Sequence, residues 1–455
     1  MINQFEQWLR ENSITEVECL VPDLGGIARG KILPTNKFIK GLKDDSHRLP
    51  QSIFIQTISG GYATEDDNGL PPEVYNPTDI DVKLRPDFNT LRIVPWYADP
   101  TAQVICDAVS LNGNPIANAS RNVLKKIIKM FADNKIKAIV SPEIEFYLVK
   151  PNPDADYPLE VPIGLSGRQE TGKQSFGIDA VNEFDPLFED VYNYCEAQNI
   201  EIDTINHESG SAQMEINFQH GDPLELADQV FTFKRTLRQS AIRHKLYATF
   251  MAKPIENQPG SSMHLHQSLH NNESSENIFY DKKNTLSKIM NYYIGGLQEF
   301  TPKLMPIHAP NVNSYRRLFA TWDAPRNTKW GIGNRSCGFR IPSNEENSMR
   351  VENRISGSDT NPYLVFAANL AAGYLGIEHK IKASEETKKS VFDEKKSSLP
   401  KNMEEAIILF ENDEKLKNVF GERFIKTIAA IRRVEYQAYL KVISSWEREY
   451  LLLNV

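Results

Sequence analysis

The sequence lacks several features that define whole classes of protein. It has only four cysteines among 455 residues, and they are far apart with no CxxC pair, so neither a zinc ribbon nor a disulfide framework is expected. A reducing cytoplasm is the simplest location for such a chain. No apolar run is long enough to span a bilayer, and the N-terminal dozen residues have no apolar core of signal-peptide length. We therefore expect a cytoplasmic protein without a membrane partner.

The charge balance argues against a nucleic-acid-binding protein. The net charge is −8 at pH 7, and no strongly basic stretch stands out, so nucleic acid is not an expected partner. Apolar residues make up 40% of the chain and charged residues 25%. This composition suits a soluble globular protein that has one large core, or a large and a small domain.

The patterns along the chain divide it into two parts. An amphipathic helix is predicted at residues 3–12, and short β-rich runs separated by Gly, Pro, Asn and Asp clusters follow it. We assign residues 13–110 to a small N-terminal domain and 115–455 to a larger domain. The polar segment LNGNPIANAS joins them. A strong helix comes next, and Ser120 is available as its N-cap.

Four short segments share a two-residue alternation of polar and apolar side chains, which is typical of strands with one polar face. They are SPEIEFYLV, SAQMEINF, SSMHLHQSL and MRVENRI. The polar positions are Glu143, Glu145 and Tyr147 in the first, Gln213, Glu215 and Asn217 in the second, Ser262, His264, His266 and Ser268 in the third, and Arg350, Glu352 and Arg354 in the fourth.

Each segment alone is typical of an ordinary strand with one side in water. Together they bring many acids and a histidine onto neighbouring polar faces, and Glu208 lies just upstream of Glu215. These carboxylates would repel one another unless cations lay between them. Carboxylate oxygens with an imidazole suit Mg²⁺ or Mn²⁺ better than zinc, and the surplus of ligands favours two ions or more.

Metal ions beside arginines are typical of enzymes that transfer phosphoryl groups, because both neutralise the charge of phosphate oxygens. The candidate arginines are Arg317, Arg335, Arg340, Arg350 and Arg354. By contrast, GRQETGKQ at 167–174 only approaches the phosphate-binding loop GxxxxGK[ST]. It has Gln174 where the metal-binding hydroxyl belongs, and no apolar strand precedes it, so we interpret it as a loop.

The same segments, in the same order, resemble the glutamine synthetase superfamily over nearly the whole chain. SPEIEFYL is similar to the family's Glu-x-Glu strand, and HESGSAQMEIN to its second pair of metal-binding glutamates. GSSMHLHQSL resembles the histidine strand, and RVENRISGSDTNPYL the Arg-x-Glu-x-Arg strand with the helix start after it. NVNSYRRL and NRSCGFRIP resemble the arginine segments that bind glutamate and phosphate.

The resemblance implies a role for each matched residue. Glu145, Glu208 and Glu215 would hold the metal that faces glutamate, and Glu143, His264 and Glu352 the metal on the nucleotide phosphates. Gly260, Arg317 and Arg354 would bind glutamate, Arg335 and Arg340 would stabilise the transferring phosphoryl group of ATP, and His266, Ser268 and Arg350 would line the nucleotide side.

The resemblance also implies an α+β fold, with a small N-terminal β-grasp domain and a large catalytic domain built on a curved antiparallel sheet with flanking helices. Active sites of this family lie between subunits of a ring, so we expect a homo-oligomer, commonly a dodecamer of two stacked hexamers. The reaction implied is ATP-dependent. Glutamate becomes γ-glutamyl phosphate, and a nitrogen nucleophile then displaces phosphate to form an amide.

The chain departs from the family pattern at two informative places. The flap often carries Glu where WDAP places Asp323, the candidate base. Glutamine synthetases proper also carry Phe-Asp-Gly-Ser-Ser, whose Asp helps bind ammonium, whereas HRLPQSIFIQTISGG here has no such Asp. The sequence is therefore similar to the γ-glutamylpolyamine synthetase branch. The alternatives are a glutamine synthetase that uses ammonia, a ligase for a small monoamine such as methylamine or ethanolamine, and a catalytically inactive relative.

Overall fold

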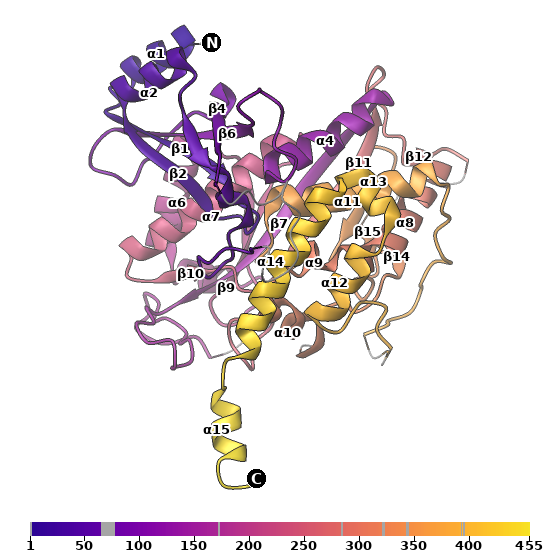
Figure 1. Ribbon diagram of the computed structural model, residues 1–455. Coiled ribbons are helices and arrows are strands. Elements are labelled where there is room, and N and C mark those ends of the chain that lie inside the picture. Colours follow the sequence, from indigo (N-terminus) through magenta and orange to yellow (C-terminus); the bar gives the residue numbers. More distant parts are fainter. Residues whose placement is uncertain are drawn as a thin grey trace.

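The computed structural model describes residues 2–64, 78–171, 173–283, 285–320, 324–342, 345–392, 394 and 396–455. Within them, two β-sheets lie side by side and helices pack around the larger sheet (Figure 1). No helix among these residues is both long and apolar enough to cross a membrane. The α+β architecture is as expected from the sequence.

The smaller sheet has the arrangement of a β-grasp. Strands β1 and β2 form an antiparallel hairpin, helix α2 follows, and β6 returns beside β1 in parallel. The predicted N-terminal helix is α1, one residue earlier than expected. The elements are α1 (Ile2–Glu11), β1 (Glu16–Pro22), β2 (Ala28–Pro34), α2 (Thr35–Asp44), β3 (Arg48–Pro50), η1 (Gln51–Ile55), β4 (Asp81–Pro86), η2 (Phe88–Thr90), β5 (Arg92–Ile93) and β6 (Thr101–Val109).

The larger sheet has eight strands in the order β14-β15-β16-β11-β7-β9-β8, with β10 paired to β7. The four segments that alternate in the sequence are β16, β11, β7 and β9, and they are adjacent and antiparallel. The strands are β7 (Ile136–Val149), β8 (Ile202–His207), β9 (Gln213–Phe218), β10 (Tyr247–Thr249), β11 (Met263–Asn271), β14 (Trp330–Ile332), β15 (Phe339–Ile341) and β16 (Val351–Asn353); β12 (Tyr280–Asp281) and β13 (Thr285–Leu286) form a separate pair.

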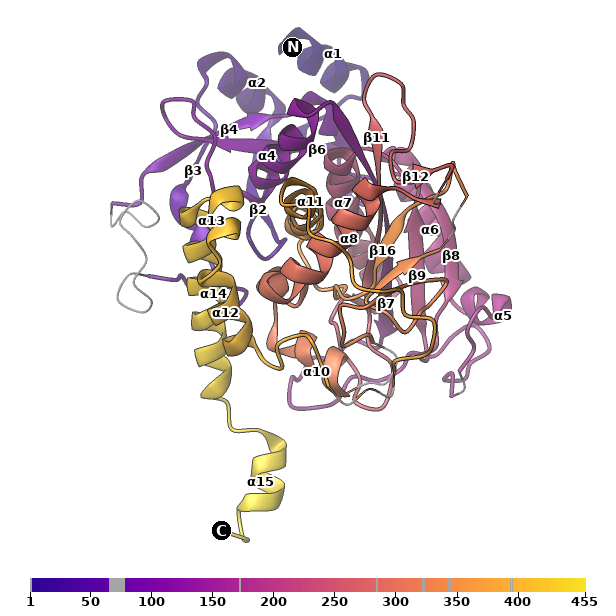
Figure 2. The same cartoon turned by 90° about the vertical axis from the view of Figure 1, so that its right-hand side faces the viewer.

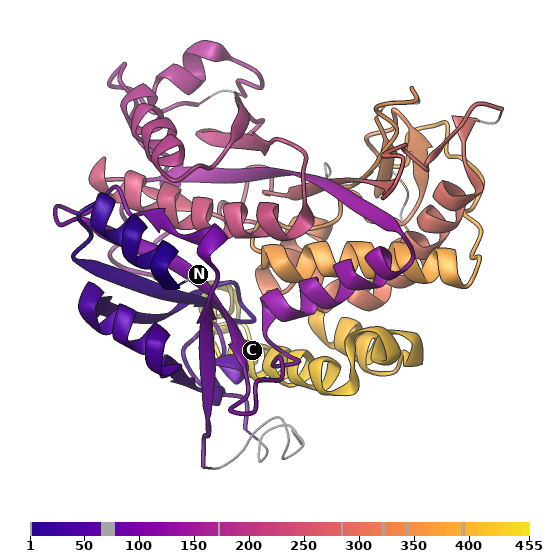
Figure 3. The same ribbon diagram turned by 90° about the horizontal axis from the view of Figure 1, so that it is seen from above.

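The apolar face of this sheet packs on three long helices, which run along the β7 ribbon in Figure 3. Ile144, Phe146 and Leu148 alternate along β7 and are completely buried against them. Burying this face holds the opposite, polar face in place as a rigid surface. The three helices are α4 (Ser120–Asp133), α7 (Pro223–Arg243) and α11 (Pro362–Glu378).

The capping prediction for α4 was wrong. Ser120 is the first residue of the helix rather than its N-cap, and its hydroxyl donates to the carbonyl oxygen of Asp23 at 2.9 Å. The start of α11 is capped instead by Asn361, whose Oδ1 accepts from the backbone N–H of Tyr363 at 3.0 Å. Since Asn361 also donates to the Asp23 carbonyl at 2.8 Å, the two helix starts are tied to the β1–β2 turn.

A buried charged cluster joins the two sheets. Arg121 in α4 donates to Asp87 at 2.7 Å and Asp107 at 2.6 Å, both from the smaller sheet's region. It also makes two hydrogen bonds, of 2.9 and 2.8 Å, to Asp228 in α7. One hydrophobic core lies wholly before α4 and another mainly after it, while the boundaries 13–110 and 115–455 remain predictions.

The remaining helices surround this framework. The last of them, α15, projects away from the body of the molecule (Figures 1 and 2) and has no buried residue. The helices are α5 (Ile178–Asn182), α6 (Asp185–Ala197), α8 (Lys288–Phe300), η3 (Thr301–Leu304), α9 (Met305–His308), α10 (Val312–Ala320), α12 (Met403–Glu411), α13 (Glu414–Phe420), α14 (Glu422–Leu440) and α15 (Ser445–Leu451).

Candidate active site

Strand register brings the polar side chains opposite one another. Glu145 on β7 is paired with Glu215 on β9, and Glu143 on the same strand is paired with His264 on β11. On the other side of β11, His266 is paired with Glu352 on β16. Four strands therefore contribute to one polar surface.

At one end of this surface lie only acids, which we call the acidic end: Glu145, Glu208 and Glu215, with ligand oxygens within 4.8 Å of one another. Burial, and then the charge of Glu145, raises the pKa of Glu208 to about 7. Burial, and then the neighbouring carboxylates led by Glu143, raises the pKa of Glu215 to about 9. Two buried carboxylates and a half-buried one, all with raised pKa values, fit a site for a divalent cation with oxygen ligands.

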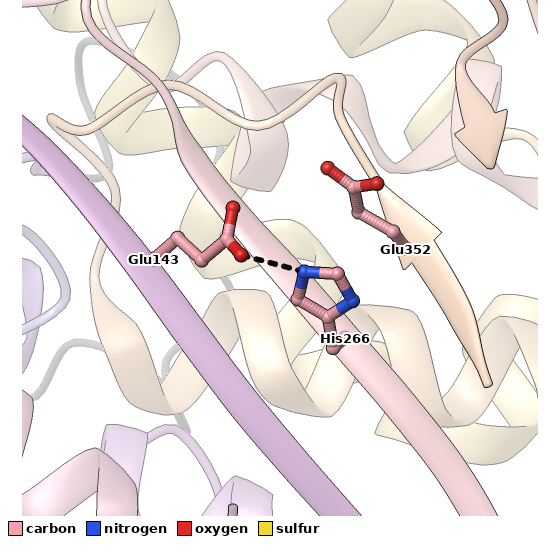
Figure 4. Close-up of side chains that lie close together, drawn as sticks. All are labelled: Glu143, His266 and Glu352. Atoms are coloured by element: carbon pink, nitrogen blue, oxygen red, sulfur yellow. Dashed lines mark hydrogen bonds and ion pairs between the residues drawn. The ribbon is translucent and has the colours of Figure 1, made fainter. Parts of the chain in front are cut away.

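The other end mixes acids with histidines and arginines, and we call it the mixed end. Figure 4 shows Glu143 on β7 and His266 on β11 linked by a hydrogen bond, with Glu352 on β16 nearby. His266 Nε2 donates to Glu143 Oε1 at 2.8 Å, while its Nδ1 accepts from Arg350 Nε at 3.2 Å. Although burial opposes it, His264 and His266 hold the pKa of Glu143 well below its usual range.

The predicted ligand trio of Glu143, His264 and Glu352 does come together. His264 Nδ1 lies 3.3 Å from Glu143 Oε2 and 3.7 Å from Glu352 Oε1. The groups here whose ligand atoms all lie within 4.8 Å of one another divide these residues differently: Glu143 with His266 and Glu352, and Glu143 with Glu215 and His264. Glu143 thus links the two ends, and His266, which the resemblance placed on the nucleotide side, lies among the possible ligands.

Ser262 contacts both ends, although no role was predicted for it from the sequence. Its hydroxyl donates to Glu145 Oε1 at 2.6 Å and lies 2.9 Å from His264 Nε2. If Nε2 carries the ring proton, it donates to Ser262, and the lone pair of Nδ1 then faces Glu143 and Glu352. That orientation fits a metal-ligating imidazole. The only sequence signal for Ser262 was its place on the polar face of β11.

Arginines balance the charge of Glu352 at the mixed end. Arg340 Nη1 donates to Glu352 Oε2 at 2.9 Å, and Arg354 Nη1 donates to Oε1 at 2.5 Å. Glu352 is fully buried, which by itself raises its pKa, but Arg354 and the two histidines lower it to about 2. Glu352 therefore stays ionised, unlike the acids at the other end.

Arg317 and Gly260 meet beside this surface. The guanidinium of Arg317, from α10, donates to the carbonyl oxygens of Ile355 at 2.8 Å and Arg354 at 3.1 Å. A Cβ on Gly260 would lie 2.5 Å from Arg317 Cγ and 2.7 Å from the Ala252 carbonyl oxygen, so only glycine fits there. Since Gln213 Nε2 donates to the Gly260 carbonyl at 3.0 Å, this loop is fixed to β9.

The predicted residue Arg335 lies apart from the clusters. Arg335 is exposed in the turn between β14 and β15. Asp323 lies outside the described residues. Ser268, by contrast, lines a cavity of about 660 Å³ beside the mixed end, a volume suited to a small-molecule ligand. The cavity lining includes Lys137, Glu143, His266, Ser268, His270 and Arg350.

A family comparison agrees with this geometry. Residues 117–451 match the model for the glutamine synthetase catalytic domain. The chain belongs to the glutamine synthetase family. Members of this family are ATP-dependent ligases that use Mg²⁺ or Mn²⁺, and this chain is a ligase of that kind.

Relatives within the glutamine synthetase family differ in the nitrogen compound that they are named for. The chain is 33% identical to the γ-glutamylputrescine synthetase PuuA of Escherichia coli over 96% of its own length and 92% of PuuA. It is also 33% identical to the glutamine synthetase of Pyrococcus abyssi, over 90% and 92% of the two chains. A glutamate–isopropylamine ligase of a Pseudomonas species is 29% identical, over 98% and 96%.

Solved structures confirm the fold. The chain superposes on a GmaS–ADP complex with a TM-score of 0.82 at 26% identity, covering 98% of this chain and 99% of the other. Apo GmaS gives a TM-score of 0.81 at the same identity, with 98% of each chain covered. The glutamine synthetase fold predicted from the six motifs is therefore confirmed over nearly the whole chain.

Proposed function

We propose that the protein forms a γ-glutamyl amide from L-glutamate and an organic amine, with a di- or polyamine such as putrescine as the first candidate. The observation that carries the ligase chemistry is the polar face of the large sheet, where an acidic end and a mixed end share Glu143. The similarity to PuuA over 96% of the chain supports an amine as the nucleophile.

The reaction needs two displacements. An oxygen of the glutamate γ-carboxylate attacks the γ-phosphorus of ATP, and ADP leaves. The amine nitrogen then attacks the carbonyl carbon of the γ-carboxyl group of γ-glutamyl phosphate, and phosphate leaves as the nitrogen loses a proton and the amide forms. Mg²⁺ or Mn²⁺ held by the acidic end (Glu145, Glu208 and Glu215) and by Glu143, His264 and Glu352 would neutralise the phosphate and carboxylate oxygens.

The arginines of the site hold the reacting groups. Arg317 and Arg354 would bind the carboxylates of glutamate, and the Gly260 loop closes against Arg317. Arg340 and Arg335 would stabilise the transferring phosphoryl group. The guanidinium groups of Arg340 and Arg354 already contact Glu352, so they need little rearrangement when charge develops in the transition state. Such preorganised charge is usually the largest contribution to rate acceleration.

The amine must lose a proton before it attacks, because a primary amine has a pKa near that of lysine, about 10.4. Asp323 is our candidate for the group that takes this proton. His266, Ser268 and Arg350 would contact ATP, since all three line the cavity beside the mixed end.

Ammonia is the second candidate nucleophile, and two observations favour it. The Pyrococcus abyssi glutamine synthetase is as similar as PuuA. The segment LPQSIFI also has its apolar side chains Ile53, Phe54 and Ile55 buried within this chain, which leaves them unable to line a channel for an alkyl group. An acid does lie there: Asp79 accepts from the backbone N–H and the hydroxyl of Ser52 at 2.9 and 2.8 Å.

We also propose a ring assembly, a dodecamer of two stacked hexamers, in the cytoplasm. Exposed apolar side chains of α15 and the chain end, among them Trp446, Leu452 and Leu453, support subunit contacts because such a group is costly to leave in water. The cytoplasmic location is supported by four cysteines that are all free and buried.

The deciding experiment is an amine panel with purified protein, ATP, Mg²⁺ and glutamate. The kcat/KM values for ammonium, putrescine, spermidine, methylamine, ethanolamine and isopropylamine are compared through phosphate release and mass analysis of the γ-glutamyl product. We expect a di- or polyamine to exceed ammonium. If ammonium gives the highest value, the protein is a glutamine synthetase. Absence of ATP turnover with every amine would identify a catalytically inactive relative.

A further inference from the structure

In the loop GRQETGKQ, the Glu170 side chain contacts the turn that carries Glu208. Glu170 Oε2 accepts from His207 Nε2 at 3.0 Å and from the backbone N–H of Ala212 at 2.8 Å. Its other oxygen, Oε1, is buried and has no hydrogen-bond partner among the described residues. Burying a carboxylate oxygen without a hydrogen-bond partner costs free energy, so the contacts of the other oxygen must offset this cost and keep the side chain in place.

Both contacts of Glu170 fall on the turn that carries Glu208. His207 is fully buried at the end of β8, and its Nδ1 lies 2.7 Å from the carbonyl oxygen of Glu208. Ala212 closes the turn with φ of +56°, a left-handed conformation that costs free energy for a residue with a Cβ. Glu170 thus contacts His207 and Ala212, the residues at which the turn begins and ends.

The Glu208 side chain itself has little other support. Its Oε1 accepts a long hydrogen bond, 3.4 Å, from Asn206 Nδ2, and its carboxylate also accepts from the backbone N–H of Ser209, which belongs to the same turn. Its backbone N–H donates to the Gln213 carbonyl at 2.8 Å, which fixes the strand ladder but not the direction of the turn. The orientation of the carboxylate therefore depends on how the turn from His207 to Ala212 is held.

We propose that Glu170 is a positioning residue that holds Glu208 in the orientation needed to bind a divalent cation at the acidic end. This inference rests on the metal-binding role of Glu145, Glu208 and Glu215 in the proposed function. It gives GRQETGKQ, which we interpret from the sequence only as a loop, a role in supporting the metal site.

Mn²⁺ binding to the full-length protein without substrates tests the proposal, with free Mn²⁺ measured by electron paramagnetic resonance. Glu208→Ala first identifies which class of Mn²⁺ sites belongs to the acidic end. We expect Glu170→Ala to weaken that class by about 10- to 100-fold, the usual effect of removing a group that orients a ligand. The other class should keep its affinity. Glu170→Gln should lie in between, because its amide oxygen can still accept from Ala212.

Glu183, which follows α5, offers a matched control for Glu170. Its Oε2 accepts from the backbone N–H of Ser166 at 2.9 Å, so it anchors the start of the loop without reaching the Glu208 turn. Glu183→Ala should bind Mn²⁺ as the wild type does. The proposal is overturned if Glu170→Ala and Glu170→Gln keep both classes intact, if both classes weaken equally, or if Glu183→Ala has the same effect as Glu170→Ala.

Failure of the proposed function would show separately. Mn²⁺ binding needs neither ATP nor amine, so a protein that fails the amine panel but shows this pattern keeps the role of Glu170. Thermal melting of each metal-free variant identifies one that does not fold, and Glu170→Gln, which preserves size and one hydrogen bond, then carries the test.

Discussion

The two ends of the polar face hold similar acids in opposite electrostatic states. At the acidic end, burial and mutual repulsion raise the pKa of Glu215 to about 9. At the mixed end, Arg354 and the histidines outweigh burial and lower the pKa of Glu352 to about 2. The acidic end therefore holds its carboxylates only with protons or an added cation between them, whereas at the mixed end Arg340 and Arg354 already balance Glu352.

The largest effect should come from removing one acid at either end. We expect Glu145→Ala and Glu352→Ala each to lower kcat by at least about 10²–10³, the usual loss when an electrostatic contact of the transition state is removed. Steady-state phosphate release with saturating ATP and glutamate measures this. Glu160→Ala is the control, because Glu160 makes only an exposed ion pair with Lys150. Near-normal turnover in either site variant contradicts the assignment.

In the metal-free protein, substitutions at the two ends should change the free energy of unfolding in opposite directions. Glu352→Gln leaves Arg340 and Arg354 without their buried partner, and breaking such a pair typically costs about 3–5 kcal/mol. Glu215→Gln removes a repelled carboxylate and should raise the free energy of unfolding. Urea unfolding at pH 8 in the presence of EDTA measures both changes. If both variants are destabilised equally, the two ends do not differ as described.

The pH dependence of stability sharpens the same contrast. Because the pKa of Glu215 is raised from 4.5 to about 9 on folding, ionising it costs free energy in the folded protein, and stability falls as pH rises through this range. Over this pH range, the free energy of unfolding of the wild type should fall relative to that of Glu215→Gln by up to about 1.4 kcal/mol per pH unit. The contribution of Glu352 to stability changes with pH in the opposite direction. Its pKa is lowered to about 2, so its contribution is present above pH 4.5 and is lost as pH falls toward 2.

The smallest effect should come from Ser262, which contacts both ends at once. Ser262→Ala removes the hydroxyl that links Glu145 and His264, and we expect metal affinity to fall about 10-fold, the low end for loss of a group that orients ligands. Calorimetric Mn²⁺ titration measures it. Ser262→Thr keeps the hydroxyl and serves as the control. A loss confined to one class of sites would show that Ser262 does not couple the ends.

The sequence predicted this surface well because strand alternation fixes the face of each side chain. Glu143, Glu145 and Glu215 could be placed on one side from their spacing alone, and the family resemblance supplied the order of the strands. Alternation does not give register, so the hydrogen bond between Glu143 and His266 could not be foreseen. Glu170 was missed because it lies far from Glu208 in the chain, and only the folded loop brings it to the Glu208 turn.

The cap of α4 failed for a related reason. Ser120 has the residue type of an N-cap, but its hydroxyl finds a tertiary partner, the Asp23 carbonyl, which no local pattern records. The β-rich runs of the N-terminal part were recognised as strands, while the parallel pairing of β1 with β6 depends on contacts made after the chain has returned.

The charged cluster around Arg121 also limits how the molecule can move. A rotation of the smaller sheet against the larger one would pull Arg121 away from Asp87 and Asp107, or from Asp228, and would leave buried charges unpaired. Such a loss typically costs about 3–5 kcal/mol, which makes a hinge between the two sheets a rare event. The Arg121 cluster therefore favours movement of the two sheets together over rotation of one against the other.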